Sequence, residues 1–283
     1  MKNQKIGLLA LLMFTCLMSA CRVHRQQKTA PVNISIFADH IGTMAKQKGI
    51  SFTEAAQQIQ ALGYRGVDVW VHQNPEHIRI LDSLGFQHAS AIVFIDFCSG
   101  EQPEMEERTI RFMKENKFDK VLLAPGFIPD GSTPEAVDSI RMRIVKFWQR
   151  GHKEGLDILL EDYDRYDSPC CSIARLDSIY RLAPKMGHVF DTGNYFFVGE
   201  DEMEALDRFQ KRIHHIHMKD RLRARNGKVP PVGTGDIHIR EVVQRMKASG
   251  YQGWYTAEFF GCEDMYQAAA TSIQNFMLFY NVK

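Results

Sequence analysis

The sequence predicts one closed barrel of eight parallel strands, each followed by a helix, that is, a single (β/α)8 barrel. From about residue 32 onward, short apolar runs alternate with longer segments in which apolar residues recur at helical spacing. Most of these helical segments end at a glycine just before the next apolar run, and glycine readily adopts the left-handed C-cap conformation. The first apolar run leads into Phe37-Ala38-Asp39-His40, which is not the glycine-rich phosphate loop of an open doubly wound sheet. Eight such units in the remaining length fit a closed barrel.

The units can be placed in order along the chain. The apolar runs predicted to be strands are residues 33–37, 66–71, 89–95, 120–124, 158–161, 188–191, 213–218 and 254–259. The segments predicted to be helices are residues 51–62, 75–84, 103–116, 134–154, 172–182, 203–209, 237–248 and 265–280. The first of these helices begins at the capping box Ser51-Phe52-Thr53-Glu54. Short strands that alternate with helices in this way run parallel.

Composition and charge indicate which kinds of binding partner to expect. The chain of 283 residues is 45% hydrophobic and 24% charged, which is ordinary for a globular protein. Its formal net charge is +1 and its pI about 7.7, so overall electrostatics do not favour nucleic acid or an anionic membrane surface. We therefore expect no nucleic-acid partner.

The N-terminal residues have the features of an export signal and are set apart from the barrel at residues 32–283. Lys2 and Lys5 precede an apolar run at residues 6–18 that is too short to span a bilayer. Met18-Ser19-Ala20-Cys21 then resembles a bacterial lipobox, so residues 1–20 are interpreted as a signal peptide and Cys21 as the lipidated residue. Residues 21–31 would be a polar tether that holds the protein on the periplasmic side of a membrane. A signal peptide cut elsewhere and a buried apolar helix are the alternatives.

Four further cysteines lie in the barrel: Cys98, Cys170, Cys171 and Cys262. Their spacing matches neither a disulfide framework nor a zinc pattern. Unpaired thiols are the preferred interpretation, and a disulfide stays open because the expected compartment is oxidising.

Four predicted strands in succession end on a residue that can bind metal: Glu161, Asp191, His217 and Glu258. The C-terminal ends of barrel strands open onto one mouth, so these side chains should lie side by side. Three carboxylates brought together would repel one another unless a cation accompanies them. Three oxygen ligands and one imidazole suit one divalent metal ion, with Mn²⁺, Mg²⁺ or Co²⁺ favoured and Zn²⁺ possible.

These strand ends belong to longer motifs that resemble the sugar phosphate isomerase/epimerase group of the xylose isomerase-like TIM barrels. That group includes ketose 3-epimerases, inosose dehydratases and endonuclease IV-like proteins, and the resemblance covers essentially the whole barrel. By similarity the four strand-end residues match the metal-ligand positions, with His217 rather than His215 as the imidazole ligand. The motifs are Leu159-Leu160-Glu161, Phe190-Asp191-Thr192-Gly193-Asn194, His215-Ile216-His217-Met218-Lys219-Asp220, Val232-Gly233-Thr234-Gly235-Asp236 and Ala257-Glu258.

The resemblance implies proton abstraction next to a carbonyl group of a small-molecule sugar. A metal-bound keto-sugar would lose its α-proton to give an ene-diolate, with Glu161 and Glu258 as the two catalytic groups on opposite sides of the carbon. Arg223 matches an arginine that contacts substrate oxygens in ketose epimerases. A solvated loop charge is an equally open interpretation of Arg223.

Departures from the family pattern affect the expected substrate contacts. Asn194 stands where these proteins generally have histidine, and an amide can orient a hydroxyl group but cannot act as an acid. Asp68 stands where many members have glutamate. His40, His72 and Asp220 follow predicted strands and are further candidates for substrate binding at the mouth.

Other functions remain as alternatives to a sugar isomerase or epimerase. A keto-sugar dehydratase or lyase would share the first chemical step, and a non-catalytic sugar-binding lipoprotein could keep the barrel. The trinuclear zinc site of an endonuclease IV-like nuclease needs more histidines at strand ends than this sequence offers, so the sequence argues against a nuclease.

Overall fold

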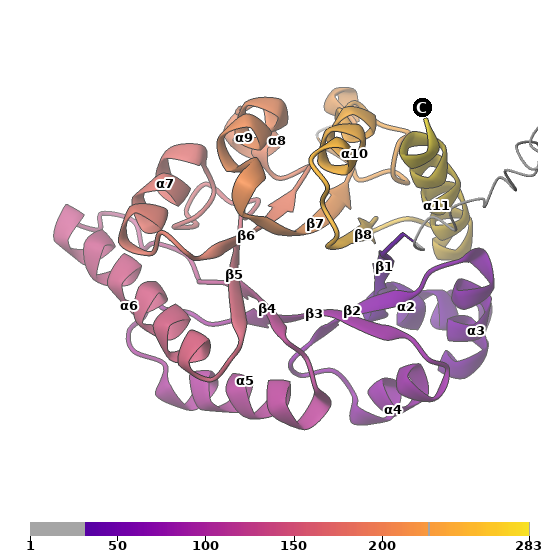
Figure 1. Ribbon diagram of the computed structural model, residues 1–283, viewed down its shortest axis with the longest axis horizontal. Helices are drawn as coiled ribbons and strands as arrows, with labels where there is room; N and C mark the ends of the chain where they lie inside the picture. Colours follow the sequence, from indigo (N-terminus) through magenta and orange to yellow (C-terminus); the bar gives the residue numbers. More distant parts are fainter. Residues whose placement is uncertain (1–31, 226, 283) are drawn as a thin grey trace, which may run out of the picture. The chain divides into compact units, whose positions relative to one another are not determined.

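Eight parallel strands close into a barrel in the order in which they occur in the sequence, with β1 paired to β8 (Figure 1). The helices surround this barrel, as the sequence predicted for a (β/α)8 fold. The strands are β1 (Ile34–Phe37), β2 (Gly66–Trp70), β3 (Gln87–Phe94), β4 (Lys120–Ala124), β5 (Asp157–Glu161), β6 (Gly187–Asp191), β7 (Ile213–Lys219) and β8 (Trp254–Glu258). The helices are α2 (Ala38–Lys48), α3 (Phe52–Leu62), α4 (Pro75–Ser83), α5 (Pro103–Asn116), α6 (Pro134–Lys153), α7 (Ile173–Leu182), α8 (Tyr195–Val198), α9 (Glu202–Phe209), α10 (Ile239–Ala248) and α11 (Met265–Asn281).

The computed structural model describes residues 32–225 and 227–282. The expected signal peptide, the lipidated Cys21 and the tether at residues 21–31 lie outside the described residues. Residues 33–283 form the unit that contains the barrel. Among the described helices, none is both long enough and apolar enough to cross a membrane. Cys98, Cys170, Cys171 and Cys262 are free thiols.

One major helix was missed by the sequence analysis. Residues 38–48 follow β1 without a break and form α2, a segment for which the sequence pattern predicted no helix. The N-cap is Phe37, whose side chain makes no capping hydrogen bond, so the usual polar start signal is absent from the sequence. The helix is held instead by its buried face, which includes Ile41 and Met44 and packs against neighbouring elements of the barrel.

The interior of the barrel is divided between apolar and polar side chains. Its apolar cluster is formed by residues from five strands, Phe37, Ile92, Leu122, Leu159 and Val189, with Trp70 packed against it. The polar part is a fully buried network around Asp68, whose carboxylate accepts hydrogen bonds from Ser90 (2.7 Å) and Thr256 (3.0 Å). Thr256 also pairs with Ser35 at 2.6 Å. Because buried polar groups need partners, this network fixes the register of several strands at once.

Candidate metal centre and its pocket

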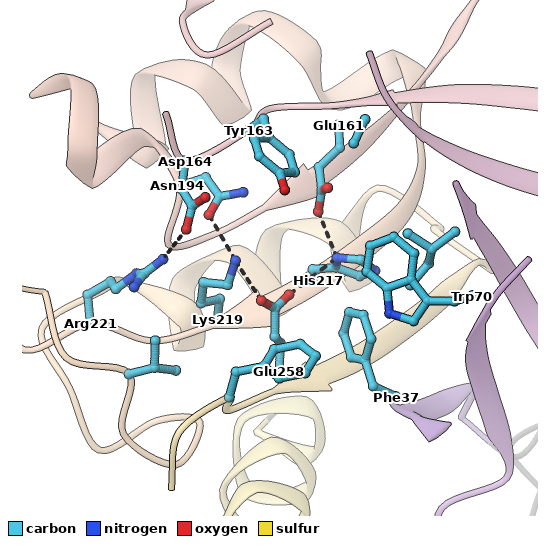
Figure 2. Close-up of a pocket in the computed structure, with 14 residues that line it drawn as sticks. Phe37, Trp70, Glu161, Tyr163, Asp164, Asn194, His217, Lys219, Arg221 and Glu258 are labelled. Carbon is cyan, nitrogen blue, oxygen red and sulfur yellow. Dashed lines mark hydrogen bonds and ion pairs between the residues drawn. The ribbon is translucent and has the colours of Figure 1, made fainter. Parts of the chain in front are cut away.

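Four side chains capable of binding metal converge where strands β5 to β8 end. Glu161, Asp191 and Glu258 are the last residues of their strands, and His217 pairs with Asp191 in the strand register. One ligand atom of each residue lies within 4.8 Å of one ligand atom of every other, and all four residues are buried. Glu161 and Glu258 approach the His217 ring from opposite sides (Figure 2). The structure thus brings together the four residues that the sequence singled out.

These residues border a cavity of about 330 Å³, here called the inner pocket. One wall is apolar and aromatic, formed by Phe37, Trp70, Ile92 and Phe260 among others. The rest of the lining is mainly polar and includes the two glutamates, Lys219 and Arg221. The volume is at the lower end of the range of about 300–1,000 Å³ that is usual for small-molecule sites. The inner pocket therefore suits one small ligand with a polar side and an apolar side.

Lys219 is a functional residue that the sequence analysis did not select. Its ammonium group lies 2.8 Å from Asp191 Oδ2, 2.6 Å from Glu258 Oε1 and 2.9 Å from the side-chain oxygen of Asn194. Burial alone would lower the pKa of Lys219, but Asp191 and Glu258 outweigh burial and raise the pKa well above its usual value. A signal for Lys219 was available: β7 extends to Lys219, so residues 215, 217 and 219 share the inward face of one strand.

His217 is held by carboxylates at both ring nitrogens. Nδ1 lies 2.9 Å from Glu161 Oε1 and 3.4 Å from Glu258 Oε2, while Nε2 lies 3.1 Å from Asp68 Oδ2. Burial alone would lower the pKa of His217, but hydrogen bonds with Asp68 and Glu161 raise it well above its ordinary value. In this arrangement Nδ1 faces the candidate metal ligands Glu161 and Glu258, and Nε2 faces Asp68.

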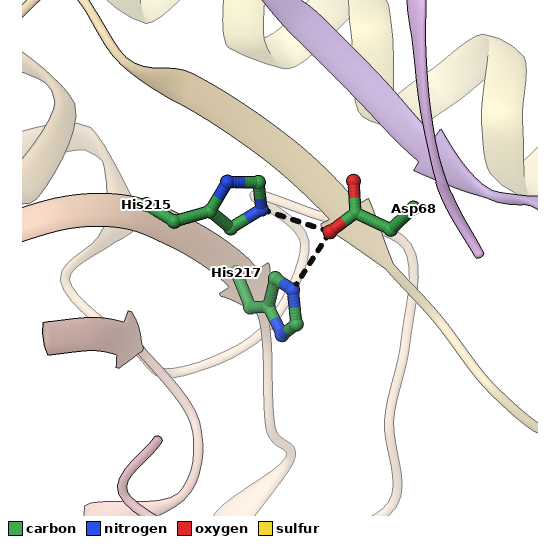
Figure 3. A group of neighbouring side chains, drawn as sticks. All are labelled: Asp68, His215 and His217. Carbon is green, nitrogen blue, oxygen red and sulfur yellow. Dashed lines mark hydrogen bonds and ion pairs between the residues drawn. The ribbon is translucent and has the colours of Figure 1, made fainter. Parts of the chain in front are cut away.

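Asp68 links His217 to the polar network inside the barrel (Figure 3). The same oxygen, Oδ2, lies 2.8 Å from Nε2 of His215, and His215 in turn contacts Thr256 at 2.8 Å. Histidines that bind metal usually donate their other N–H to a carboxylate, which fixes the tautomer and the ring orientation. Asp68 occupies that position for His217, so it is a positioning residue.

Two carboxyl groups of the cluster, Glu258 and Glu161, have raised pKa values because they are buried. Burial is the main cause that raises the pKa of Glu258 to about 8, with further upward shifts from Asp191 and Glu161. Burial also raises the pKa of Glu161. Nearby Lys219 and His217 act in the opposite direction on both groups. Burial therefore makes Glu161 and Glu258 weaker acids than they are in water, and a bound divalent cation would reverse that effect.

Asp191 is fixed by Asp162, which directly follows β5, and by the turn after β6. Its backbone N–H donates to Asp162 Oδ1 at 2.9 Å, and its own Oδ1 accepts from the N–H of Gly193 at 2.8 Å. Asn194 donates its amide to the Asp162 carbonyl and presents its oxygen to Lys219. Asn194 lines the inner pocket, and its side chain is held by the Asp162 carbonyl in a position where it orients Lys219.

The arginine in the inner pocket is Arg221, whereas the sequence pointed to Arg223. Arg221 is buried and donates to Asp164 Oδ2 (3.0 Å) and to the Gly227 carbonyl (3.0 Å). The side chain of Arg223 is half exposed, and its nearest acidic partner is Glu202 at 3.8 Å. Arg223 does not line the inner pocket. A 3-10 turn, η2 (Arg223–Arg225), redirects the chain after β7, so the inward alternation of the strand does not continue to Arg223.

Three other predicted substrate contacts lie elsewhere. His40 is buried behind the pocket, where its Nε2 accepts from the Phe259 N–H at 3.0 Å and burial lowers its pKa to about 3. His72 is exposed and borders a different surface depression. Asp220 is buried and accepts from the backbone N–H groups of Gly233, Gly235 and Ile237, so it anchors the loop after β7.

Comparison with known proteins identifies the family. The sequence profile of the xylose isomerase-like TIM barrel family matches residues 53–276. The chain belongs to this family. An inosose dehydratase of Lacticaseibacillus casei is 22% identical over 250 residues, covering 75% of this chain and 83% of that protein. An inosose dehydratase of Geobacillus thermodenitrificans is 31% identical over 90 residues, but that match covers only 26% of this chain and 30% of the relative.

Solved structures with the same fold include an enzyme that acts on a free sugar. A D-allulose 3-epimerase from Methylomonas sp. in complex with D-allulose superposes with a TM-score of 0.69 at 13% identity. The superposition covers 88% of this chain and 98% of that chain. At this level of identity the comparison establishes a shared fold.

The donor set of this family member fits a hard or borderline divalent metal ion. Three carboxylates and one imidazole surround a common point, which suits Mn²⁺, Mg²⁺ or Co²⁺ better than a thiolate-preferring ion. Among the described residues, no group makes a well-formed hydrogen bond to Asp191 Oδ2, although Lys219 Nζ lies 2.8 Å away. That buried oxygen has a lone pair free for a metal ion.

We predict that Asp68→Asn weakens divalent-metal binding about 10- to 100-fold, because the amide no longer stabilises the orientation and basicity of His217. Competition titration of Mn²⁺ against a fluorescent chelator measures the change. The matched control is Asp82→Asn, which alters another aspartate–histidine pair, Asp82 with His88 at 2.7 Å, on the surface. Equal affinities of Asp68→Asn and Asp82→Asn would contradict the positioning role.

Metal binding should also depend on pH through Glu258. Its raised pKa of about 8 means that the carboxyl is mainly protonated at pH 7 in the metal-free protein, and binding must displace that proton. Below pH 8 the affinity should rise by at least about tenfold per pH unit, because Glu258 must lose its proton and His217, whose pKa is also raised, must be neutral to bind metal. Isothermal titration calorimetry in buffers of different ionisation enthalpy counts the released protons. A constant affinity from pH 6 to pH 9 would rule this linkage out.

Proposed function

We propose that the protein is a divalent-metal-dependent sugar isomerase or epimerase that abstracts the proton next to the carbonyl group of a keto-sugar. The observation that carries the proposal is the pair of buried glutamates, Glu161 and Glu258, whose carboxyl groups reach His217 Nδ1 from opposite sides within a group of four candidate metal ligands. Family membership and the sugar-modifying relatives support a sugar as the substrate class.

The apolar and the polar residues of the inner pocket would bind different parts of a sugar. The aromatic wall of Phe37 and Trp70 suits the apolar C–H face of a sugar, while Lys219 and Arg221 can donate hydrogen bonds to its oxygens. A metal ion bound by Glu161, Asp191, His217 and Glu258 would polarise the substrate carbonyl and stabilise the negative charge that develops on its oxygen. The burial of the cluster excludes water and strengthens these electrostatic interactions.

The two glutamates would move the proton. One carboxylate oxygen, on Glu161 or Glu258, takes the α-proton from one face of the carbon, and the other carboxyl group returns a proton. Return to the opposite face inverts the stereocentre, which is epimerisation. The ammonium group of Lys219, 2.6 Å from Glu258, stabilises the charged form of that carboxylate during the transfer.

We predict that Glu161→Gln and Glu258→Gln each abolish exchange of the substrate α-proton with solvent, because glutamine cannot accept a proton. The rate should fall by at least about 100-fold, the lower range for loss of a general acid or base. Proton NMR in D₂O with Mn²⁺-free, Mg²⁺-loaded protein and a panel of ketohexoses measures deuterium at the stereocentre.

Glu106→Gln is the control for this experiment, because Glu106 is a partly buried glutamate paired with Arg150 on the outer helices. Sugar binding without any exchange, in the native protein and in both variants, would favour the non-catalytic sugar-binding alternative.

A dehydratase is the second candidate, favoured by the inosose dehydratase relatives and by the position of Lys219. Elimination needs the same α-proton abstraction and then a proton for the leaving hydroxyl group. Lys219 lines the inner pocket and carries protons that can be donated to that hydroxyl oxygen. The NMR experiment separates the two candidates, since an epimerase retains the hydroxyl group and a dehydratase gives a product that has lost water.

We further propose that the protein is exported and anchored through a lipid on Cys21, so that it meets extracytoplasmic sugars. The proposal is supported by the lipobox-like segment at residues 18–21. The predicted result is that cells labelled with a radioactive fatty acid incorporate label into the native protein but not into the Cys21→Ser variant. Equal labelling of both proteins would refute lipidation at Cys21.

A further inference from the structure

A second cavity, of about 580 Å³, lies beside the inner pocket and is built from different elements. We call it the outer pocket. It is bordered by α2, by the segment that enters α3, and by the turn between β2 and α4. Its lining includes Asp39, Gly42, Thr43, Lys46, Gln73 and His77. None of these residues takes part in the metal centre described above, so the outer pocket needs an explanation of its own.

Two contacts connect the outer pocket to the inner pocket. Phe260, which follows β8 and is 40% exposed, lines both cavities. Phe37 lines the inner pocket, and the next residue in the chain, Ala38, lines the outer pocket. The two cavities therefore adjoin at Phe260 and at the start of α2.

The outer pocket offers hydrogen-bonding groups of several kinds around a partly aromatic surface. Gln73 and His77 are held to each other at 3.1 Å, and the His77 ring stacks on Phe52 with a centroid distance of 3.8 Å. Asp39 brings a negative charge and Lys46 a positive one, so the lining does not select a charged ligand. Acceptors, donors and aromatic rings in a neutral setting suit the hydroxyl groups and C–H faces of a sugar.

We propose that the outer pocket is a second carbohydrate subsite and that the substrate is a glycoside. The inner pocket holds the reacting sugar, and the outer pocket holds the sugar ring attached to it. The small volume of the inner pocket supports this division, because about 330 Å³ accommodates one small ligand and leaves a second ring only the adjoining cavity. The proposal rests on the proposed function, since it takes the inner pocket as the reacting subsite.

Gly42 provides a way to close the outer pocket without disturbing the fold. It lies within α2 and lines the cavity, and a Cβ atom placed on it would meet nothing within 4 Å. Gly42→Trp should therefore put an indole ring into the outer pocket and obstruct it, whereas Gly42→Ala adds one methyl group and leaves most of the space. The two variants differ only in how much of the cavity they occupy.

The experiment is isothermal titration calorimetry of the full-length, Mn²⁺-loaded protein with the ketose disaccharides lactulose, maltulose and palatinose, and with fructose, glucose and galactose as the component sugars. We expect at least one disaccharide to bind at least tenfold more tightly than its components. Gly42→Trp should remove that advantage and Gly42→Ala should keep it. No advantage for any of the three disaccharides, or an advantage that survives Gly42→Trp, would overturn the second subsite.

Failure of the second subsite and failure of the proposed function would give different results. A disaccharide advantage that Gly42→Trp removes, in a protein that never exchanges the α-proton, would support the subsite and refute the proposed function. Solvent exchange with a single ketohexose that depends on Glu161 and Glu258, without any disaccharide advantage, would support the proposed function and refute the subsite.

Discussion

The concentration of negative charge at the end of strands β5 to β8 is the constraint on which the site depends. Glu161, Asp191 and Glu258 are buried within a few ångströms of one another, and burial raises the pKa of Glu161 and of Glu258. The protein supplies one cation of its own at this point, Lys219, which lies next to Asp191 and Glu258. A divalent ion would complete the neutralisation, and the same charge would then be available to polarise a substrate carbonyl.

The polar network inside the barrel contacts this cluster through Asp68, which lies next to His217. A packed barrel core usually consists of bulky apolar side chains, but one side of this core is occupied by Asp68, His215 and Thr256. The network is costly unless every member is paired, and its pairs hold His217 in one orientation. Strand register, core packing and ligand geometry are therefore set by the same set of contacts. A substitution in this network would affect metal binding as well as stability.

The surroundings of the metal centre explain why substrate selection can be separated from chemistry. The glutamates, His217 and Lys219 line the inner pocket together with the aromatic side chains of Phe37, Trp70 and Phe260. Beyond Phe260 and Trp70, α2 and the turn after β2 build the outer pocket. Apart from Phe260, which follows β8, these parts come from the ends of β1 and β2 and from the segments that follow them, and the candidate ligands come from strands β5 to β8. Changes in the first half of the barrel can therefore alter which sugar binds without altering the ligands.

The sequence by itself determined the barrel and the four metal-ligand candidates, because both depend on local patterns. Apolar alternation marks a strand, and the residue at its end is placed at the mouth by the parallel arrangement. Tertiary structure decided what local patterns do not contain. Helix α2 lacks a polar N-cap and is held by packing. Asp220 accepts hydrogen bonds from the loop that folds back onto it. The turn η2 directs Arg223 outward, while Arg221 remains in the inner pocket. The outer pocket likewise exists only because α2, the β2–α4 turn and Phe260, which are far apart in sequence, meet at one place in the folded chain.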